Sequence, residues 1–149
     1  MFKILLALHL LTAIFAIGPL VGAATTASRG LRKADAGPTE SAARTLTIYG
    51  YASIAVVVFG MGVMSSKSPY THQTVADMGD LWIWLSLLLW VASLGLLFAV
   101  TIPTLKKAGV AIGTGDAAQA LTGKVAASGG IIGLIYAAIV FLMVYRPGS

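Results

Sequence analysis

The chain has 149 residues, of which 58% are hydrophobic and 10% charged, and it carries a net charge of +5 and no cysteine. A soluble domain has about 25% charged residues, so this composition predicts a membrane protein, and the missing cysteine excludes disulfides and thiolate zinc sites. The basic residues fall in short loops between apolar stretches, which favours topology control and anionic lipids as partners over nucleic acid.

Four apolar stretches predict transmembrane helices at about residues 4–27, 45–65, 81–103 and 117–145, in one domain covering residues 1–149. The first stretch exceeds the apolar core of about 7–15 residues found in secretory signals, so we expect it to be retained. Asp80 directly precedes the third stretch and is expected to cap that helix with its carboxylate. Pro103 is expected to end the same helix, because proline lacks an amide proton and clashes with the preceding turn.

The predicted fold class is an all-α membrane protein, with four antiparallel transmembrane helices in a bundle and both termini outside. Loops 28–44 and 104–124 hold seven Lys and Arg, against three on the other side, so the positive-inside rule places these two loops in the cytoplasm of a bacterial inner membrane. Five aromatic residues are expected at the membrane interfaces: Trp82, Trp84 and Tyr145 outside, and Tyr49 and Tyr51 inside.

The apolar spans within these stretches, residues 4–24, 45–64, 81–102 and 125–144, contain no Asp, Glu, Lys or Arg. Proton relays, voltage sensors and ion pumps need such groups within the bilayer, so a proton-coupled pump or an ion transporter is disfavoured. The few acids lie in loops, which also disfavours a metallohydrolase or a Ser-His-Asp enzyme. We therefore expect a protein that is not an enzyme and has no cofactor.

His9 is the only histidine within a span, and no other acidic or basic side chain lies there. It is either a metal or haem ligand, or a neutral imidazole that donates a hydrogen bond to a carbonyl of a neighbouring helix. Met61 and Met64 lie at a similar predicted depth, with His72 and Met78 in the adjacent loop. Thioether and imidazole ligands together suit Cu(I), although methionine is also an ordinary filler of apolar gaps.

Small residues recur at four-residue spacing in the first and fourth spans. Gly18 and Gly22 form one pair, and Gly129, Gly133 and Ala137 form the other stripe. Such stripes let helix backbones approach closely, either within the bundle or against another membrane subunit. Pro19 is expected to loosen the helix around it and, with Gly18 and Gly22, to form a partner-docking surface.

A basic cluster follows the first span. Arg29, Arg32 and Lys33 lie within five residues of one another and are expected to control topology or to contact anionic lipid headgroups.

The segment LHLLTAIFAIGPLVGAA sets His9 in an L-H-x-L-x-A pattern that is followed by glycine. In this segment and in its four-span layout the chain resembles bacterial predicted integral membrane proteins of unknown function, distantly similar to copper-resistance D-type membrane domains. Those domains are richer in span histidines, and only His9 carries over. Small proteins of this layout are also known as accessory subunits of envelope complexes, including lipid-importing transporters of the mammalian-cell-entry type.

Together these features predict a non-enzymatic accessory or stabilising subunit of a larger inner-membrane complex, such as a transporter. The alternative is a small protein that binds or transports copper or a hydrophobic ligand through His9, Met61 and Met64.

Overall fold

A computed structural model describes residues 1–148 and is helical in all four predicted spans. In chain order the elements are α1 (Phe2–Thr12), η1 (Ala13–Ile17), α2 (Gly18–Thr26), α3 (Ser28–Arg32), α4 (Ala36–Ser65), α5 (Leu81–Leu96), η2 (Leu97–Thr101), α6 (Ile102–Gly113), η3 (Gln119–Leu121) and α7 (Thr122–Tyr145). They join into four continuous helices, Phe2–Arg32, Ala36–Ser65, Leu81–Gly113 and Gln119–Tyr145, here called spans one to four. Each is long and apolar enough to cross a membrane, so the chain is a multi-pass membrane protein.

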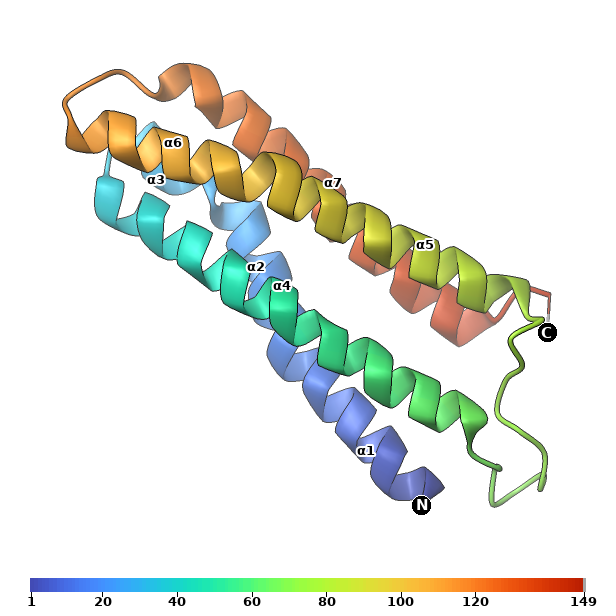
Figure 1. Cartoon of the computed structure of the whole chain (residues 1–149). Coiled ribbons are helices and arrows are strands. Elements are labelled where there is room, and N and C mark those ends of the chain that lie inside the picture. The colour runs from blue at the N-terminus through green and yellow to red at the C-terminus, as the bar shows by residue number, and fades with distance from the viewer. Residues whose placement is uncertain (149) are drawn as a thin grey trace.

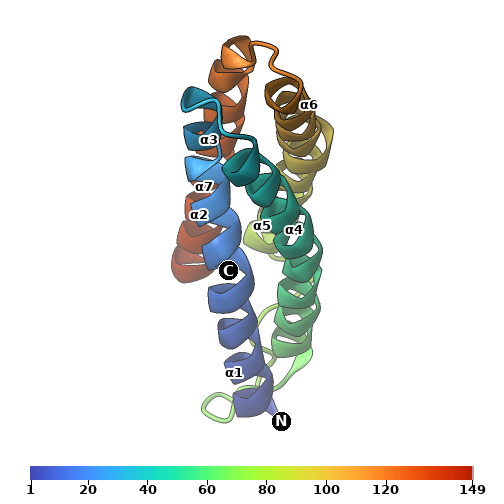
Figure 2. The same ribbon diagram turned by 90° about the vertical axis from the view of Figure 1, so that its left-hand side faces the viewer.

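The four spans form an up-down bundle, as expected (Figure 1). The turns at residues 33–35 and 114–118 lie together at one end, here called the closed end, and both termini and the loop at residues 66–80 lie at the other, the open end. Span one contacts span two, span two contacts span three, and span four contacts spans one and three. Toward the open end the pair α1–α4 separates from the pair α5–α7 (Figures 1 and 2).

Spans one, two and three are longer than the sequence predicts. Span two begins at Ala36 rather than near residue 45, because Asp35 is its N-cap and accepts a hydrogen bond from the Gly37 amide at 3.2 Å. The earlier start puts Tyr49 and Tyr51 about 20 Å along the helix, and their place at a membrane interface stays a prediction.

Pro103 does not end the third helix, contrary to expectation. The helix passes through it to Gly113, and the turn before it, η2, is π-helical. Span one accommodates its proline in the same way, because the π-helical turn η1 lies directly before Gly18 and Pro19. A proline in a helix removes one amide donor and crowds the carbonyl four residues earlier, and one wider turn relieves both problems without ending the helix.

Asp80 occupies the N-cap position of α5, but its carboxylate makes no capping bond to that helix. It accepts instead from the Asp77 amide at 3.0 Å, within the loop at residues 66–80. The same loop contains an isolated antiparallel bridge between Lys67 and Thr74, and the Trp84 indole donates to the Met78 carbonyl at 2.8 Å. The predicted cap is therefore a loop contact.

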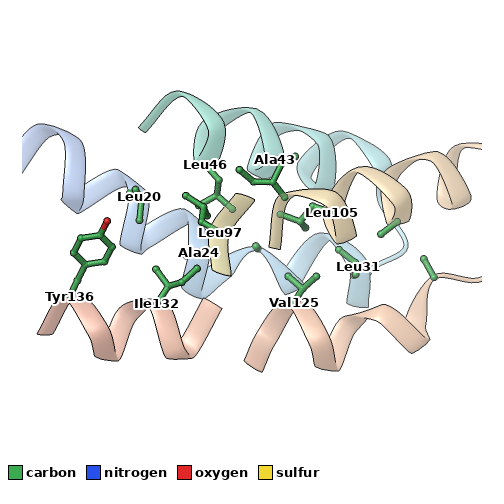
Figure 3. Close-up of a cluster of buried hydrophobic side chains, with 14 of the residues drawn as sticks. Leu20, Ala24, Leu31, Ala43, Leu46, Leu97, Leu105, Val125, Ile132 and Tyr136 are labelled. Carbon is green, nitrogen blue, oxygen red and sulfur yellow. The ribbon is translucent and has the colours of Figure 1, made fainter. Parts of the chain in front are cut away.

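The packed core lies at the closed end and in the middle of the bundle (Figure 3). Its fully buried apolar side chains come from all four spans: Leu20, Leu31, Leu46, Leu97, Leu105, Val125 and Ile132. By contrast, no residue of α1 is buried. The core thus fixes the closed end, and the open end has no comparable centre.

Candidate functional site

His9 is held by a neighbouring helix of the same chain. Its Nδ1 lies 2.9 Å from the carbonyl oxygen of Val56 in α4, and since a carbonyl only accepts, this nitrogen carries the proton. Gly60, one turn along α4, makes room for the ring, because a Cβ there would lie 3.0 Å from the His9 Cε1. Of the two interpretations of His9, the interhelical hydrogen bond describes the geometry.

Both methionines lie on α4, the helix against which His9 packs. Met61 is 43% exposed on the surface of α4, and Met64 lies one turn nearer the helix end than Gly60, against which His9 packs. His72 lies in the exposed loop at residues 66–80. In the described part of the chain no three His, Asp or Glu side chains are grouped to hold a metal ion. Binding of Cu(I) by His9 and the methionines stays a prediction.

The glycines of span four are used inside the bundle. A Cβ on Gly129 would overlap the Ala24 carbonyl of α2, and one on Gly133 would lie 3.2 Å from the Thr25 Cγ2 and 3.8 Å from the Val21 Cγ1. These two positions bring spans one and four into backbone contact. The structure therefore places Gly129 and Gly133 in an intramolecular contact, where a partner subunit has no access.

The other predicted docking residues have no such neighbour. Gly18 and Gly22 are exposed, and a Cβ built on either would meet nothing within 4 Å. Ala137 of α7 is exposed as well, while Pro19 is half-buried. The predicted docking residues that another protein could contact are therefore those on the outer surface of span one, together with Ala137.

Span one is the least covered helix of the bundle. Only 11% of its most apolar 18-residue window is buried, against 28% in each of the other three spans. Its first half, α1, packs against α4, with Leu5 on Gly62 and His9 on Gly60. The remainder of α1 presents large apolar side chains that the chain leaves exposed: Ile4, Leu8, Leu10 and Leu11.

A polar cluster that the sequence reading missed lies where the two helix pairs separate. The Trp90 indole of α5 donates to the Ser53 hydroxyl of α4 at 3.1 Å, and Ser53 in turn donates to the Gly50 carbonyl at 2.7 Å. The Tyr136 hydroxyl of α7 lies close to Ser53 and Ser93 but makes no hydrogen bond of ordinary geometry with them. This cluster links α4 of one helix pair to α5 of the other by a hydrogen bond.

A second polar contact joins spans three and four, where the Thr101 hydroxyl donates to Ser128 at 2.9 Å. Isolated Ser and Thr residues within apolar stretches are the available sequence signal for such bonds, because buried hydroxyls need partners in lipid. The sequence alone gives no pairing, since Ser53 and Trp90 are 37 residues apart.

The basic cluster lies at the closed end, and Arg29, Arg32 and Lys33 are all exposed. Arg29 also lines a hollow of about 310 Å³ between the last turns of span one and the first turns of span two. The hollow has Thr26 on one side and Ser41 and Thr45 on the other. A cation and three hydroxyls thus face a single space at one end of the bundle.

Comparison with protein-family models, with curated proteins and with solved structures gives no match to this chain.

Proposed function

We propose that the protein is a non-enzymatic accessory or stabilising subunit of a larger complex in a bacterial inner membrane, and that a partner membrane protein covers span one. The observation that carries the proposal is the uneven burial of the spans, 11% for span one against 28% for each of the others. Loops 28–44 and 104–124 would face the cytoplasm, as their basic residues predict.

Apolar exposure alone does not call for a protein partner, because lipid tails solvate Leu and Ile well. Helices associate in lipid where small residues allow close backbone contact. Inside this chain Gly60, Gly129 and Gly133 each receive a neighbouring side chain or backbone, whereas Gly18 and Gly22 receive nothing. The unused glycine pair therefore lies on the least covered span, which favours a partner helix at that surface.

The type of complex follows from what the spans contain. Without Asp, Glu, Lys or Arg in residues 4–24, 45–64, 81–102 and 125–144, the chain has no group that could carry protons or ions across the membrane. A supporting role beside a transporter fits this composition, and the resemblance noted above favours a lipid-importing transporter of the mammalian-cell-entry type.

The test is site-specific photo-crosslinking in native membranes followed by purification in a mild detergent. A photoreactive residue at Leu11, which is 50% exposed on α1, should capture one membrane protein in defined stoichiometry. The matched control is Leu88, 66% exposed on α5, where we expect no protein adduct. Substituting Gly22→Leu should lower recovery of the partner by about tenfold, because a large side chain blocks close helix contact.

Gly130→Leu is the control for that substitution, since Gly130 is also exposed with nothing within 4 Å of a Cβ. It should leave recovery unchanged. A monomeric protein with only lipid adducts at Leu11 would contradict the proposal.

A further inference from the structure

The hollow beside Arg29 is built by close backbone contact at its base. A Cβ on Gly30 would lie 2.6 Å from the Thr39 Oγ1 and 2.9 Å from its amide nitrogen, so only glycine lets α3 lie this close to α4. The turn at residues 33–35 then reverses the chain, and the Asp35 amide donates to the Gly30 carbonyl at 2.9 Å. Farther from this base the hollow is lined by small side chains, including those of Ala27 and Ala42, and the space stays open.

Three of the four polar side chains that line this hollow make no hydrogen bond or ion pair within residues 1–148. Arg29 is exposed, and within residues 1–148 it makes no ion pair and no hydrogen bond from its side chain. The hydroxyls of Ser41 and Thr45 likewise have no side-chain hydrogen bond in the described chain, while Thr26 donates to the Gly22 carbonyl at 2.7 Å. One guanidinium and two free hydroxyls can all donate to a ligand that supplies several acceptor oxygens.

The two acidic residues near the hollow, Asp35 and Glu40, do not line it. The Asp35 carboxylate accepts from the Gly37 amide as the cap of α4. The Glu40 side chain packs against Gly109 of α6, where its Cγ lies 3.0 Å from a Cβ built on that glycine, and α6 is not part of the hollow. Arg29 is therefore the only charged residue lining the space, and the hollow suits an anion.

The position of the hollow favours a lipid as the source of that anion. Spans one and two are 31 and 30 residues long, more than the roughly 20 residues that cross the hydrocarbon core, so the last turns of span one and the first turns of span two reach the headgroup region. Toward the membrane centre the wall of the hollow becomes apolar at Ala23, with Pro19 one turn beyond. A headgroup can lie against Arg29 while its acyl chain follows this apolar side.

We propose that this hollow binds the phosphodiester headgroup of an anionic glycerophospholipid. The Arg29 guanidinium donates to the phosphate oxygens, and Ser41 and Thr45 donate to phosphate or glycerol oxygens. Arg32 and Lys33 lie within one turn and strengthen the attraction for a lipid with net negative charge.

Native mass spectrometry of the purified full chain with phosphatidylglycerol tests the site. The protein should retain one phosphatidylglycerol in preference to phosphatidylcholine, and Arg29→Gln should reduce its occupancy by about tenfold, the usual cost of losing a charged hydrogen-bond donor. Lys107→Gln removes one exposed charge from α6 at the same end and should change occupancy less than about twofold.

Further variants test lipid binding in the hollow even if Arg29→Gln disturbs folding of the protein. Arg29→Lys retains the charge but loses the bidentate geometry, and it should bind between the wild type and the glutamine variant. The double substitution Ser41→Ala with Thr45→Val should weaken binding by about threefold. Helicity and elution volume should match the wild type in every case.

Three outcomes would overturn the proposal. Equal losses for Arg29→Gln and Lys107→Gln would mean that the lipid responds to overall charge only. Equal retention of phosphatidylcholine and phosphatidylglycerol would remove the preference for an anion. Displacement of the lipid by millimolar inorganic phosphate, with phosphate then retained in its place, would identify a soluble ion as the ligand. Each result is independent of whether span one has a protein partner.

Discussion

The closed end and the open end of this bundle both carry large apolar side chains, yet only the closed end packs them into a common core. There the side chains of Leu31, Leu46 and Leu105 are inaccessible, while Leu88 and Ile4 in the open half are 66% and 65% exposed. Apolar composition therefore does not bring membrane helices together. Lipid tails solvate an exposed leucine as well as another helix does, so closure needs some additional interaction.

Glycines and short turns supply that interaction at the closed end. Gly30 and Gly129 each accept a neighbouring backbone at a distance that a Cβ would not allow, and Gly109 lies in tight contact with the Glu40 side chain. The turns at residues 33–35 and 114–118 hold successive helices side by side there, whereas residues 66–80 join the two pairs at the open end through a longer loop. In the open half, close glycine contacts such as His9 on Gly60 lie within a pair, and the Trp90–Ser53 hydrogen bond links one pair to the other.

The largest expected effect is at Gly129. Gly129→Ala places a Cβ onto the Ala24 carbonyl, a backbone atom that can move only if span one moves, so we expect a loss of about 3 kcal/mol. Gly130→Ala adds the same methyl group to the next residue, where nothing lies within 4 Å, and it should be nearly neutral. Helicity measured against the mole fraction of SDS compares the two. Equal stabilities would mean that spans one and four are not in contact.

Two leucine-to-alanine substitutions compare the halves directly. Leu105→Ala leaves a cavity in the core and should cost about 2 kcal/mol, at the low end of the range for soluble cores because lipid also solvates the unpacked side chain. Leu88→Ala exchanges one lipid contact for another and should change stability by less than about 0.5 kcal/mol. The same SDS titration measures both, and a costly Leu88→Ala would show that the open half closes.

The polar link at the junction should contribute less. Ser53→Ala removes the acceptor of the Trp90 indole, and hydrogen bonds between membrane helices are worth about 0.6 kcal/mol on average. We expect a loss of about 1 kcal/mol, because the indole proton is left without its partner. Ser65→Ala, which removes only an exposed bond to the Met61 carbonyl, is the control. Tryptophan emission should shift for Ser53→Ala and stay constant for Ser65→Ala.

The helical fold could be predicted because it depends on local chemistry. Twenty or more apolar residues in a row must form a helix in lipid, where each amide needs a partner inside its own segment. The helix ends were predicted less well, since polar residues such as Asp35 and Glu40 extend span two beyond its apolar part. The effect of Pro103 was missed because a π-helical turn is an adjustment of the whole backbone, and no single residue in η2 indicates it.

The candidate sites could likewise be predicted only in part from the sequence. Small residues, a histidine and a basic cluster are visible in the sequence, but their neighbours are not. Gly22 and Gly129 look alike as members of small-residue stripes, yet one is exposed and the other is buried against Ala24. The suitability of the hollow beside Arg29 for an anion depends on the Glu40 side chain lying elsewhere, and the packing of α4 against α6 sets its position.

The smallest expected effect is at His9, and it separates a packing histidine from a ligand. His9→Phe keeps a ring of similar size beside Gly60 but removes the donor to the Val56 carbonyl, so the loss should be about 0.6 kcal/mol. Adding Cu(I) should shift neither protein in the SDS titration. A copper-dependent stabilisation of the wild type that His9→Phe abolishes would instead make His9 a ligand. Met61 or Met64 would then be the natural additional ligands, because both lie on α4, the helix against which α1 and His9 pack.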